Sequence, residues 1–341
     1  MESETQIPEN RKERAQGVLC PVLFLLIAVF VMNLPLLTGC GSDKEKVRVG
    51  VSISGIAPPN SQVIEQAIKE KAEEYGAKIV YDREGLVDLL SKGIDVLILN
   101  RSSPGELEAS VKGTHHASIP VVVLGCSAPQ NLHVEACVKV NLFETGRIAA
   151  DYVVKALGGK GNVIILEGPR HDETARQITL GMYSVLEQQD AIRIVADEQH
   201  PNWDEKLAAD TVRFTLKKYA ENIQAILAGN SQLAMGAVRA VAERGLVSKI
   251  ITAGIGADLA ACRAIIGNRH DVEVDRMSHG LGVEALSLAV AVAKDEDFAY
   301  DEEVGEGNPK IKVKYGPLRL ITRENVSVMK SVWPQLIEQG R

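Results

Sequence analysis

Hydrophobic and amphipathic segments alternate along residues 47–294, and this pattern predicts an α/β protein. Short apolar runs are typical of strands buried on both faces of a parallel sheet. Between them, apolar positions recur at i, i+3 and i+4, as in helices that cover such a sheet. The predicted strands are 47–53, 78–81, 95–99, 121–124, 162–166, 192–196, 225–228, 250–252 and 272–274. The predicted helices are 61–75, 85–92, 106–111, 141–157, 174–186, 204–219, 231–244, 259–266 and 281–294.

The stretch from residue 223 to residue 245 joins one strand to one helix. Gly229 ends the apolar run 225–228, Asn230 is placed to cap the following helix, and Gly245 ends that helix. Ligands of open α/β sheets bind beyond the carboxyl ends of the strands, where Asn230 falls. Its amide both donates and accepts hydrogen bonds, which suits a polar solute. A plain helix cap is the alternative interpretation.

The number of strands predicts two lobes of similar build rather than one. A chain of 341 residues has the length of about two domains, and strands that alternate with helices form parallel sheets with right-handed crossovers. The acidic, Gly-rich stretch 299–310 is predicted to be a solvated loop.

Composition and charge exclude some partners. Hydrophobic residues make up 45% of the chain and aromatic residues 4%, so the cores are filled mainly by Val, Ile, Leu and Ala. The net charge is −7 and no basic cluster follows the N-terminal segment, which argues against a nucleic-acid partner.

The N-terminal segment resembles a bacterial lipoprotein signal. A basic stretch at 11–14 precedes the apolar run 18–37, and Leu37-Thr38-Gly39-Cys40 follows at once. The resemblance implies cleavage before Cys40 and lipidation of its thiol. An uncleaved membrane anchor is the alternative, because about 20 apolar residues span a bilayer. Both place the body outside the cytoplasm, in the periplasm or at the cell surface, tethered to a membrane.

Three cysteines remain after such a signal is removed, namely Cys126, Cys137 and Cys262. They cannot all pair with one another, and their spacing fits no zinc motif. Each lies in or beside an apolar run, which favours buried thiols. We expect no metal site.

From residue 47 to residue 326 the chain resembles the type I periplasmic sugar-binding proteins of ABC transporters, especially the ribose- and xylose-binding branch. The segments that carry the resemblance are 72–76, 92–98, 119–124, 146–152, 202–204, 223–245 and 320–326. The resemblance implies two Rossmann-like lobes with parallel sheets, joined by a hinge of three crossings. These crossings are expected near Asn141, near Arg276 and before Tyr315.

The expected organisation follows from this resemblance. It comprises a signal peptide at 1–39, a tether at 40–46, an N-terminal lobe of 47–141 plus 277–309, a C-terminal lobe of 142–276 plus 310–330, and a C-terminal tail at 331–341.

The family's ligand positions carry over to some residues of this chain. Trp203 matches an aromatic residue that stacks on the sugar ring, with an ordinary hydrophobic anchor as the alternative. Asn230 matches a ligand amide. Ser54 matches a hydroxyl at the end of the first strand, although serine is also a common turn residue.

Other family positions differ, and they leave the ligand open. The two aromatics of ribose binders are replaced by Asn60 and Ser61, and an Asp-Arg pair by Gly125-Cys126. The aspartates expected after Asn230 and Gly254 are replaced by Ser231 and Gly256, and an arginine expected before Gly181 is replaced by Ile178 or Thr179.

The last crossing carries Arg276 where the family often has an amide. We expect Asn60 and Arg276 to contact the ligand. If Arg276 and Arg170 both face it, an anionic sugar derivative is possible. In the alternative interpretation, Asp275 and Arg276 pair with each other or with solvent.

Together these features predict a lipid-anchored solute-binding protein. It would be a monomer that captures a small polar, carbohydrate-like ligand and presents it to an ABC import permease. Neither catalytic residues nor a cofactor are expected, because Gly254-Ile-Gly256-Ala-Asp-Leu259 lacks the third glycine of a dinucleotide fingerprint. A sensory module that docks on a chemoreceptor or histidine kinase is the alternative.

Overall fold

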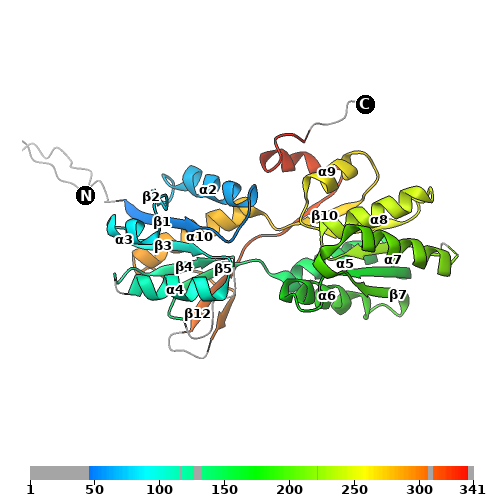
Figure 1. The fold of residues 1–341 in the computed structure, drawn as a ribbon, viewed down its shortest axis with the longest axis horizontal. Helices are drawn as coiled ribbons and strands as arrows, with labels where there is room; N and C mark the ends of the chain where they lie inside the picture. The colour runs from blue at the N-terminus through cyan, green and yellow to red at the C-terminus, as the bar shows by residue number, and fades with distance from the viewer. Residues whose placement is uncertain (1–45, 116, 126–131, 221, 306–309, 337–341) are drawn as a thin grey trace, which may run out of the picture. The chain divides into compact units, whose positions relative to one another are not determined.

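The computed structural model describes residues 46–115, 117–125, 132–220, 222–305 and 310–336. They form two α/β lobes, each built on its own sheet (Figure 1). The predicted helices and strands are found, with ends shifted by a few residues. The lipoprotein-like segment and Cys40 lie outside the described residues, as does Cys126.

The sheet of the N-terminal lobe has the order β11-β12-β5-β4-β3-β1-β2, and β11 is its antiparallel strand. Helices cover both faces, because buried side chains of α2 and α10 form one core with the sheet and those of α3 and α4 form a second. The strands are β1 (Val47–Ile53), β2 (Ala77–Tyr81), β3 (Val96–Asn100), β4 (Val121–Leu124), β5 (Ala136–Lys139), β11 (Glu302–Val304) and β12 (Ile311–Tyr315). The helices are α2 (Asn60–Lys71), α3 (Leu86–Ser91), α4 (Pro104–His115) and α10 (Ser278–Ala293).

The sheet of the C-terminal lobe has the order β13-β10-β9-β8-β6-β7, with β13 antiparallel. Helices α5 and α6 cover one face and α7 and α8 the other. The strands are β6 (Lys160–Glu167), β7 (Ala191–Gln199), β8 (Ala225–Ala228), β9 (Ile251–Ile255), β10 (Val272–Asp275) and β13 (Arg319–Ile321). The helices are α5 (Leu142–Leu157), α6 (Glu173–Leu186), α7 (Glu205–Lys218), α8 (Ser231–Glu243), α9 (Leu259–Ile266) and the 3-10 turns η1 (Pro201–Trp203) and η2 (Val326–Ser331).

The chain passes between the two sheets three times: from β5 to α5, from β10 to α10, and from β12 to β13. The third crossing lies after Tyr315, not before it. Because β12 pairs with β5 in parallel register, residues 310–315 belong to the N-terminal lobe, which corrects the boundary expected at residue 310.

Short length accounts for two of the strands that the pattern missed, β5 and β11. β5 has four residues and β11 three, too few for a hydrophobic period to stand out, and β11 lies in the stretch expected to be a loop. The expected tail is also shorter than predicted. Leu336 is buried with Met329 against Cys262 and Ile265 of α9, so the chain belongs to the C-terminal lobe as far as residue 336.

Cys137 and Cys262 are buried, which confirms the prediction of buried thiols at these two positions. Burial, with nearby carboxylates as a smaller cause, raises the pKa of Cys262 to about 12. Within the described ranges, no helix is both long enough and apolar enough to cross a membrane.

Candidate functional site

The carboxyl edge of the C-terminal sheet brings together several of the predicted site residues. Strands β6, β7, β8, β9 and β10 are parallel, so the segments that follow them lie at one edge. Trp203, Asn230 and Arg276 all come from such segments. This edge is where open α/β sheets bind ligands.

Trp203 lies across the ends of β6 and β8. A Cβ atom at Gly168 would lie 2.4 Å from the indole Cη2, and one at Gly229 would lie 3.1 Å from Cζ3. Only glycine at Gly168 therefore lets the ring rest there. The ring is half-buried and packs against the core beneath α7 and α8, and in the described part of the chain its Nε1 has no hydrogen-bond partner. Both the anchoring and the stacking interpretation fit this placement.

His200 holds the turn that carries Trp203. Its Nδ1 donates to the Glu167 carbonyl at 3.0 Å, and its Nε2 accepts from the Thr211 hydroxyl at 3.1 Å. The Trp203 amide donates to the His200 carbonyl at 3.1 Å. The imidazole is fully buried, and desolvation lowers its pKa, so it is neutral near pH 7. The chain fixes Trp203 through an uncharged histidine.

Asn230 caps α8, as one interpretation predicted. Its Oδ1 accepts a hydrogen bond from the Leu233 amide at 2.8 Å. The side chain is half-buried, and its Nδ2 donates to none of the described residues. One end of the amide thus builds the helix terminus, while the other remains available to a ligand.

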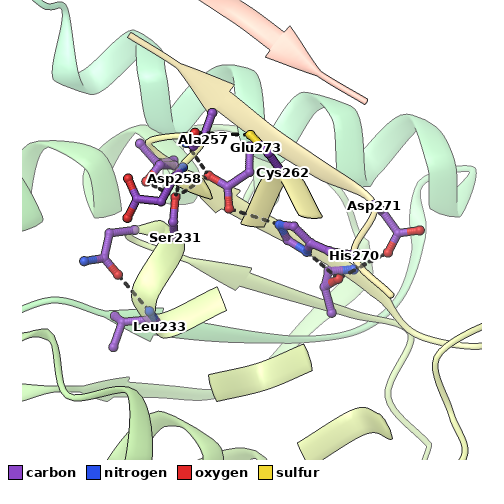
Figure 2. A network of polar contacts seen from close by, with 11 residues as sticks. Ser231, Leu233, Ala257, Asp258, Cys262, His270, Asp271 and Glu273 are labelled. Atoms are coloured by element: carbon purple, nitrogen blue, oxygen red, sulfur yellow. Dashed lines mark hydrogen bonds and ion pairs between the residues drawn. The ribbon is translucent and has the colours of Figure 1, made fainter. Parts of the chain in front are cut away.

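Ser231 is turned into the protein, away from the edge. Its side chain is buried and donates to the Glu273 carboxylate at 2.8 Å (Figure 2). Glu273 is fully buried, and it also accepts from the Ala257 amide at 2.9 Å and from His270 Nε2 at 3.0 Å. Buried carboxylates need such donors, so Ser231 serves the interior of this lobe.

Asp275 and Arg276 do not pair with each other, so this half of the alternative interpretation is wrong. Asp275 accepts from Arg319 Nη2 at 2.7 Å and from the Met277 amide at 3.0 Å. Arg276 is half-buried at the end of β10 and forms neither an ion pair nor a hydrogen bond with the described residues. Arg170 is exposed beyond β6.

In the N-terminal lobe, Ser54 and Asn60 each contact a residue of the same lobe. Ser54 is exposed, and its hydroxyl lies 3.5 Å from the Asn100 carbonyl, the limit of a hydrogen bond. Asn60 Oδ1 accepts from the Ser278 hydroxyl at 2.9 Å, which ties α2 to α10.

Asn100 is a residue that the sequence analysis missed. It is buried; its Oδ1 accepts from the Gly55 amide at 2.7 Å and its Nδ2 donates to the Leu124 carbonyl at 2.7 Å. Asn100 therefore joins the loop that follows β1 to the end of β4. In the sequence, Asn100 could have been noticed as a polar amide at the end of an otherwise apolar strand, β3.

Comparison with known proteins gives consistent matches. A family model described as a periplasmic binding protein domain matches residues 49–297. The D-xylose-binding periplasmic protein of Haemophilus influenzae is 25% identical over 278 residues, covering 78% of this chain and 83% of that protein. The ribose import binding protein of Bacillus subtilis is 23% identical over 317 residues, with 87% and 98% covered.

A solved structure shows the same fold. The periplasmic ribose ABC transporter structure from Conexibacter woesei superposes with a TM-score of 0.70 at 19% identity, covering 88% of this chain and all of that one. The resemblance to the ribose- and xylose-binding branch is confirmed by these matches. The chain belongs to the periplasmic binding protein family, and its two lobes have the type I fold.

Proposed function

We propose that this protein is an extracytoplasmic solute-binding protein that delivers a small polar, carbohydrate-like ligand to an ABC import permease. The observation that carries the proposal is the position of Trp203. Its indole lies on two glycines at the carboxyl edge of the C-terminal sheet, beside an amide whose donor is unused.

The chemistry of this edge suits a sugar. The C–H face of a sugar ring packs on a flat indole, while its hydroxyl groups hydrogen-bond to amide and guanidinium donors. Trp203 would stack on the ring, and Asn230 Nδ2 and Arg276 would bind hydroxyls. Ser54 and Asn60 would add contacts from the N-terminal lobe when the two lobes close on the ligand.

The relatives support the same class of ligand and partner. The proteins from Haemophilus influenzae and Bacillus subtilis are named for binding D-xylose and importing ribose. Lipidation of Cys40 would hold the protein at the membrane, close to its permease. A Cys40→Ser variant would then move from the membrane fraction to the soluble fraction, and a variant that stays in the membrane would contradict the lipid anchor.

A thermal-shift assay tests the binding function. The full chain in mild detergent is heated with D-ribose, D-xylose, myo-inositol, D-gluconate and D-glucose 6-phosphate. A ligand at 100 times its dissociation constant stabilises the folded state by about 2.7 kcal/mol, which raises Tm by several degrees.

The Trp203→Ala variant should lose the shift. Phe214 is an exposed aromatic residue of the same lobe, so the Phe214→Ala variant should keep the thermal shift. A panel without any shift in the parent protein would contradict a sugar importer.

A further inference from the structure

We infer that a cavity in the N-terminal lobe, beside the edge strand β2, is a second binding site that takes a small hydroxylated anion. The cavity is lined by residues of the N-terminal lobe, so the inference goes beyond the function proposed above and does not depend on it. Among the residues predicted to contact the transported ligand, only Ser54 lines this cavity. Its volume of about 740 Å³ is enough for a sugar acid or a sugar phosphate.

A short helix leaves room for the cavity. Helix α3 has 6 residues, whereas α2 and α4 have 12 each and α10 has 16. It begins at Leu86, after the loop 82–85, and does not cover the ends of β1 and β2. Val51, Ile53 and Tyr81 at these ends line the cavity, together with residues of α2 and of the loop. Because β2 is the last strand of its sheet, no further strand fills the space.

Asp82 holds the loop 82–85 in place. Its Oδ1 accepts from the Gly85 amide at 2.9 Å, and its Oδ2 accepts from the Ser52 hydroxyl at 2.5 Å. Gly85 has φ = 107°, a conformation that favours glycine. Both oxygens of Asp82 are thus hydrogen-bonded within the lobe, and this carboxylate builds the wall of the cavity.

Arg101 lines the cavity and is held by uncharged groups. Its Nε donates to the Ser110 hydroxyl at 2.9 Å, and its Nη1 donates to the carbonyls of Asn100 at 2.7 Å and Ser52 at 3.2 Å. The side chain is half-buried, and among the described residues it has no ion-pair partner and its Nη2 has no acceptor. A cation that is withdrawn from water without an anionic partner is costly. A bound anion would supply that partner.

Two further cationic side chains line the cavity without a partner. Lys69 on α2 and Arg83 in the loop are exposed, and neither forms an ion pair within the part of the chain that the structure describes. Lys71, two residues after Lys69, instead pairs with Glu74 at 2.6 Å. Three cations without a partner thus line one cavity of a chain whose net charge is −7. This concentration of positive charge favours an anion.

The acidic and amide groups of α2 indicate the rest of the ligand. Glu65 and Gln62 both line the cavity, and neither side chain has a hydrogen-bond partner among the described residues. A carboxylate accepts from hydroxyl groups, and an amide both donates and accepts. Because Glu65 repels an anion, the ligand should carry its hydroxyl groups away from its charged group. Sugar acids and sugar phosphates have this arrangement.

Isothermal titration calorimetry of the full chain in mild detergent tests the site. The probes are D-gluconate and D-glucose 6-phosphate, which differ in their charged group, and D-glucose as the neutral counterpart. We expect at least one charged probe to bind more tightly than D-glucose. Arg101→Gln should weaken its binding at least about tenfold, the usual effect of losing a charged hydrogen bond. Lys69→Gln combined with Arg83→Gln should weaken it about fivefold, since exposed charges contribute less.

The controls keep the cavity intact. Lys71→Gln combined with Lys92→Gln removes two cations of the same lobe that pair with Glu74 and Asp88, and should leave the affinity within about twofold. Trp203→Ala changes the other lobe and should also leave it within about twofold. If Arg101→Gln does not fold, Arg101→Lys keeps the charge but loses the planar fork, and should also weaken binding.

The outcomes separate this site from the proposed function. Binding of a charged probe that is lost in Trp203→Ala and kept in the Lys69 and Arg83 double variant overturns the second site. Equal affinity for D-glucose and the charged probes overturns it too, as does the absence of binding by either charged probe. None of these results affects the solute-binding function, which is tested by the Trp203-dependent thermal shift with neutral sugars.

Discussion

The carboxyl edges of the two sheets differ in what their polar residues do. In the N-terminal lobe, the side-chain oxygens of Asn100 and Asn60 accept hydrogen bonds from other residues of the lobe. Ser54 is exposed, and its hydroxyl makes one hydrogen bond at the distance limit. In the C-terminal lobe, a buried carboxylate and a neutral histidine hold the backbone from beneath. At the surface of that edge, Arg276 and the Nδ2 of Asn230 have no hydrogen-bond partner among the described residues.

This difference indicates a division of labour. Rigid, preorganised groups lose little conformational entropy on binding, so they contribute most to affinity. The C-terminal edge is built in this way and is expected to bind the ligand first. The N-terminal edge would then contribute to closure. The following changes test that contrast.

The largest effect is expected at Glu273. Its replacement by alanine leaves His270, Ser231 and the Ala257 amide without their acceptor, which should lower the free energy of unfolding by about 3–5 kcal/mol. Urea denaturation measures the loss. Asn100→Ala, the counterpart in the N-terminal lobe, removes only neutral hydrogen bonds and should cost about 2 kcal/mol.

Glu198→Ala is the control for Glu273, because it removes an exposed glutamate from strand β7. It should change the free energy of unfolding by less than about 0.5 kcal/mol. A Glu273→Ala protein as stable as this control would show that the network does not support the edge.

Trp203→Ala should weaken ligand binding by about 2 kcal/mol, or about 30-fold, because the indole offers a large apolar face. Ser54→Ala should change affinity by less than about threefold, since its hydroxyl is exposed and in only marginal contact. Calorimetric titration measures both. Equal losses of affinity in Trp203→Ala and Ser54→Ala would contradict the difference between the edges of the two sheets.

Acidification should weaken the C-terminal lobe through His200. Its pKa is lowered in the folded state, so below the unfolded value of about 6.5 the unfolded chain binds more protons. Stability is therefore fully present above that pH and is lost as the pH falls through it. Between pH 7.5 and 5.5 we expect a loss of about 1 kcal/mol.

His200→Gln should lack this part of the pH dependence, whereas the exposed His171→Gln should keep it. Because the described histidines of the N-terminal lobe are exposed, hydrogen exchange should show the acid-induced loosening near β7 and α7. Loosening confined to the N-terminal lobe would refute this assignment.

The smallest effect concerns Asp258 without ligand. Its raised pKa means that the charged form is disfavoured in the folded state, so stability rises as the pH falls through that pKa. Asp258→Asn should therefore be slightly more stable than the parent at pH 7.5, by less than about 0.5 kcal/mol. A thermal melt in which Asp258→Asn loses stability while Asp190→Asn does not would mean that the carboxylate supports the fold.

Much of the fold could be predicted from the sequence, because buried strands and amphipathic helices leave periods that are easy to detect. Strand β12 was missed as part of the N-terminal sheet, since its pairing with β5 joins residues far apart in the chain. The hydrophobic pattern of a chain does not show which strands pair with each other.

The site was predictable only in part for the same reason. Trp203 and Asn230 follow strand ends that can be seen in the sequence. Glu273 reads as a solvent-facing residue of a strand, yet the register places it opposite Gly254, whose missing side chain leaves the space that the carboxylate fills. Asp258 precedes α9, but its side chain does not cap that helix, and only the structure shows this.

Tryptophan fluorescence during titration tests the central claim most directly, because it reports contact at the C-terminal edge. We predict that a neutral polyol detected by calorimetry also changes the emission of the parent protein in a saturable way. The change should be absent in Trp203→Phe. Calorimetric binding that leaves the emission of the parent unchanged would contradict a ligand seated on Trp203.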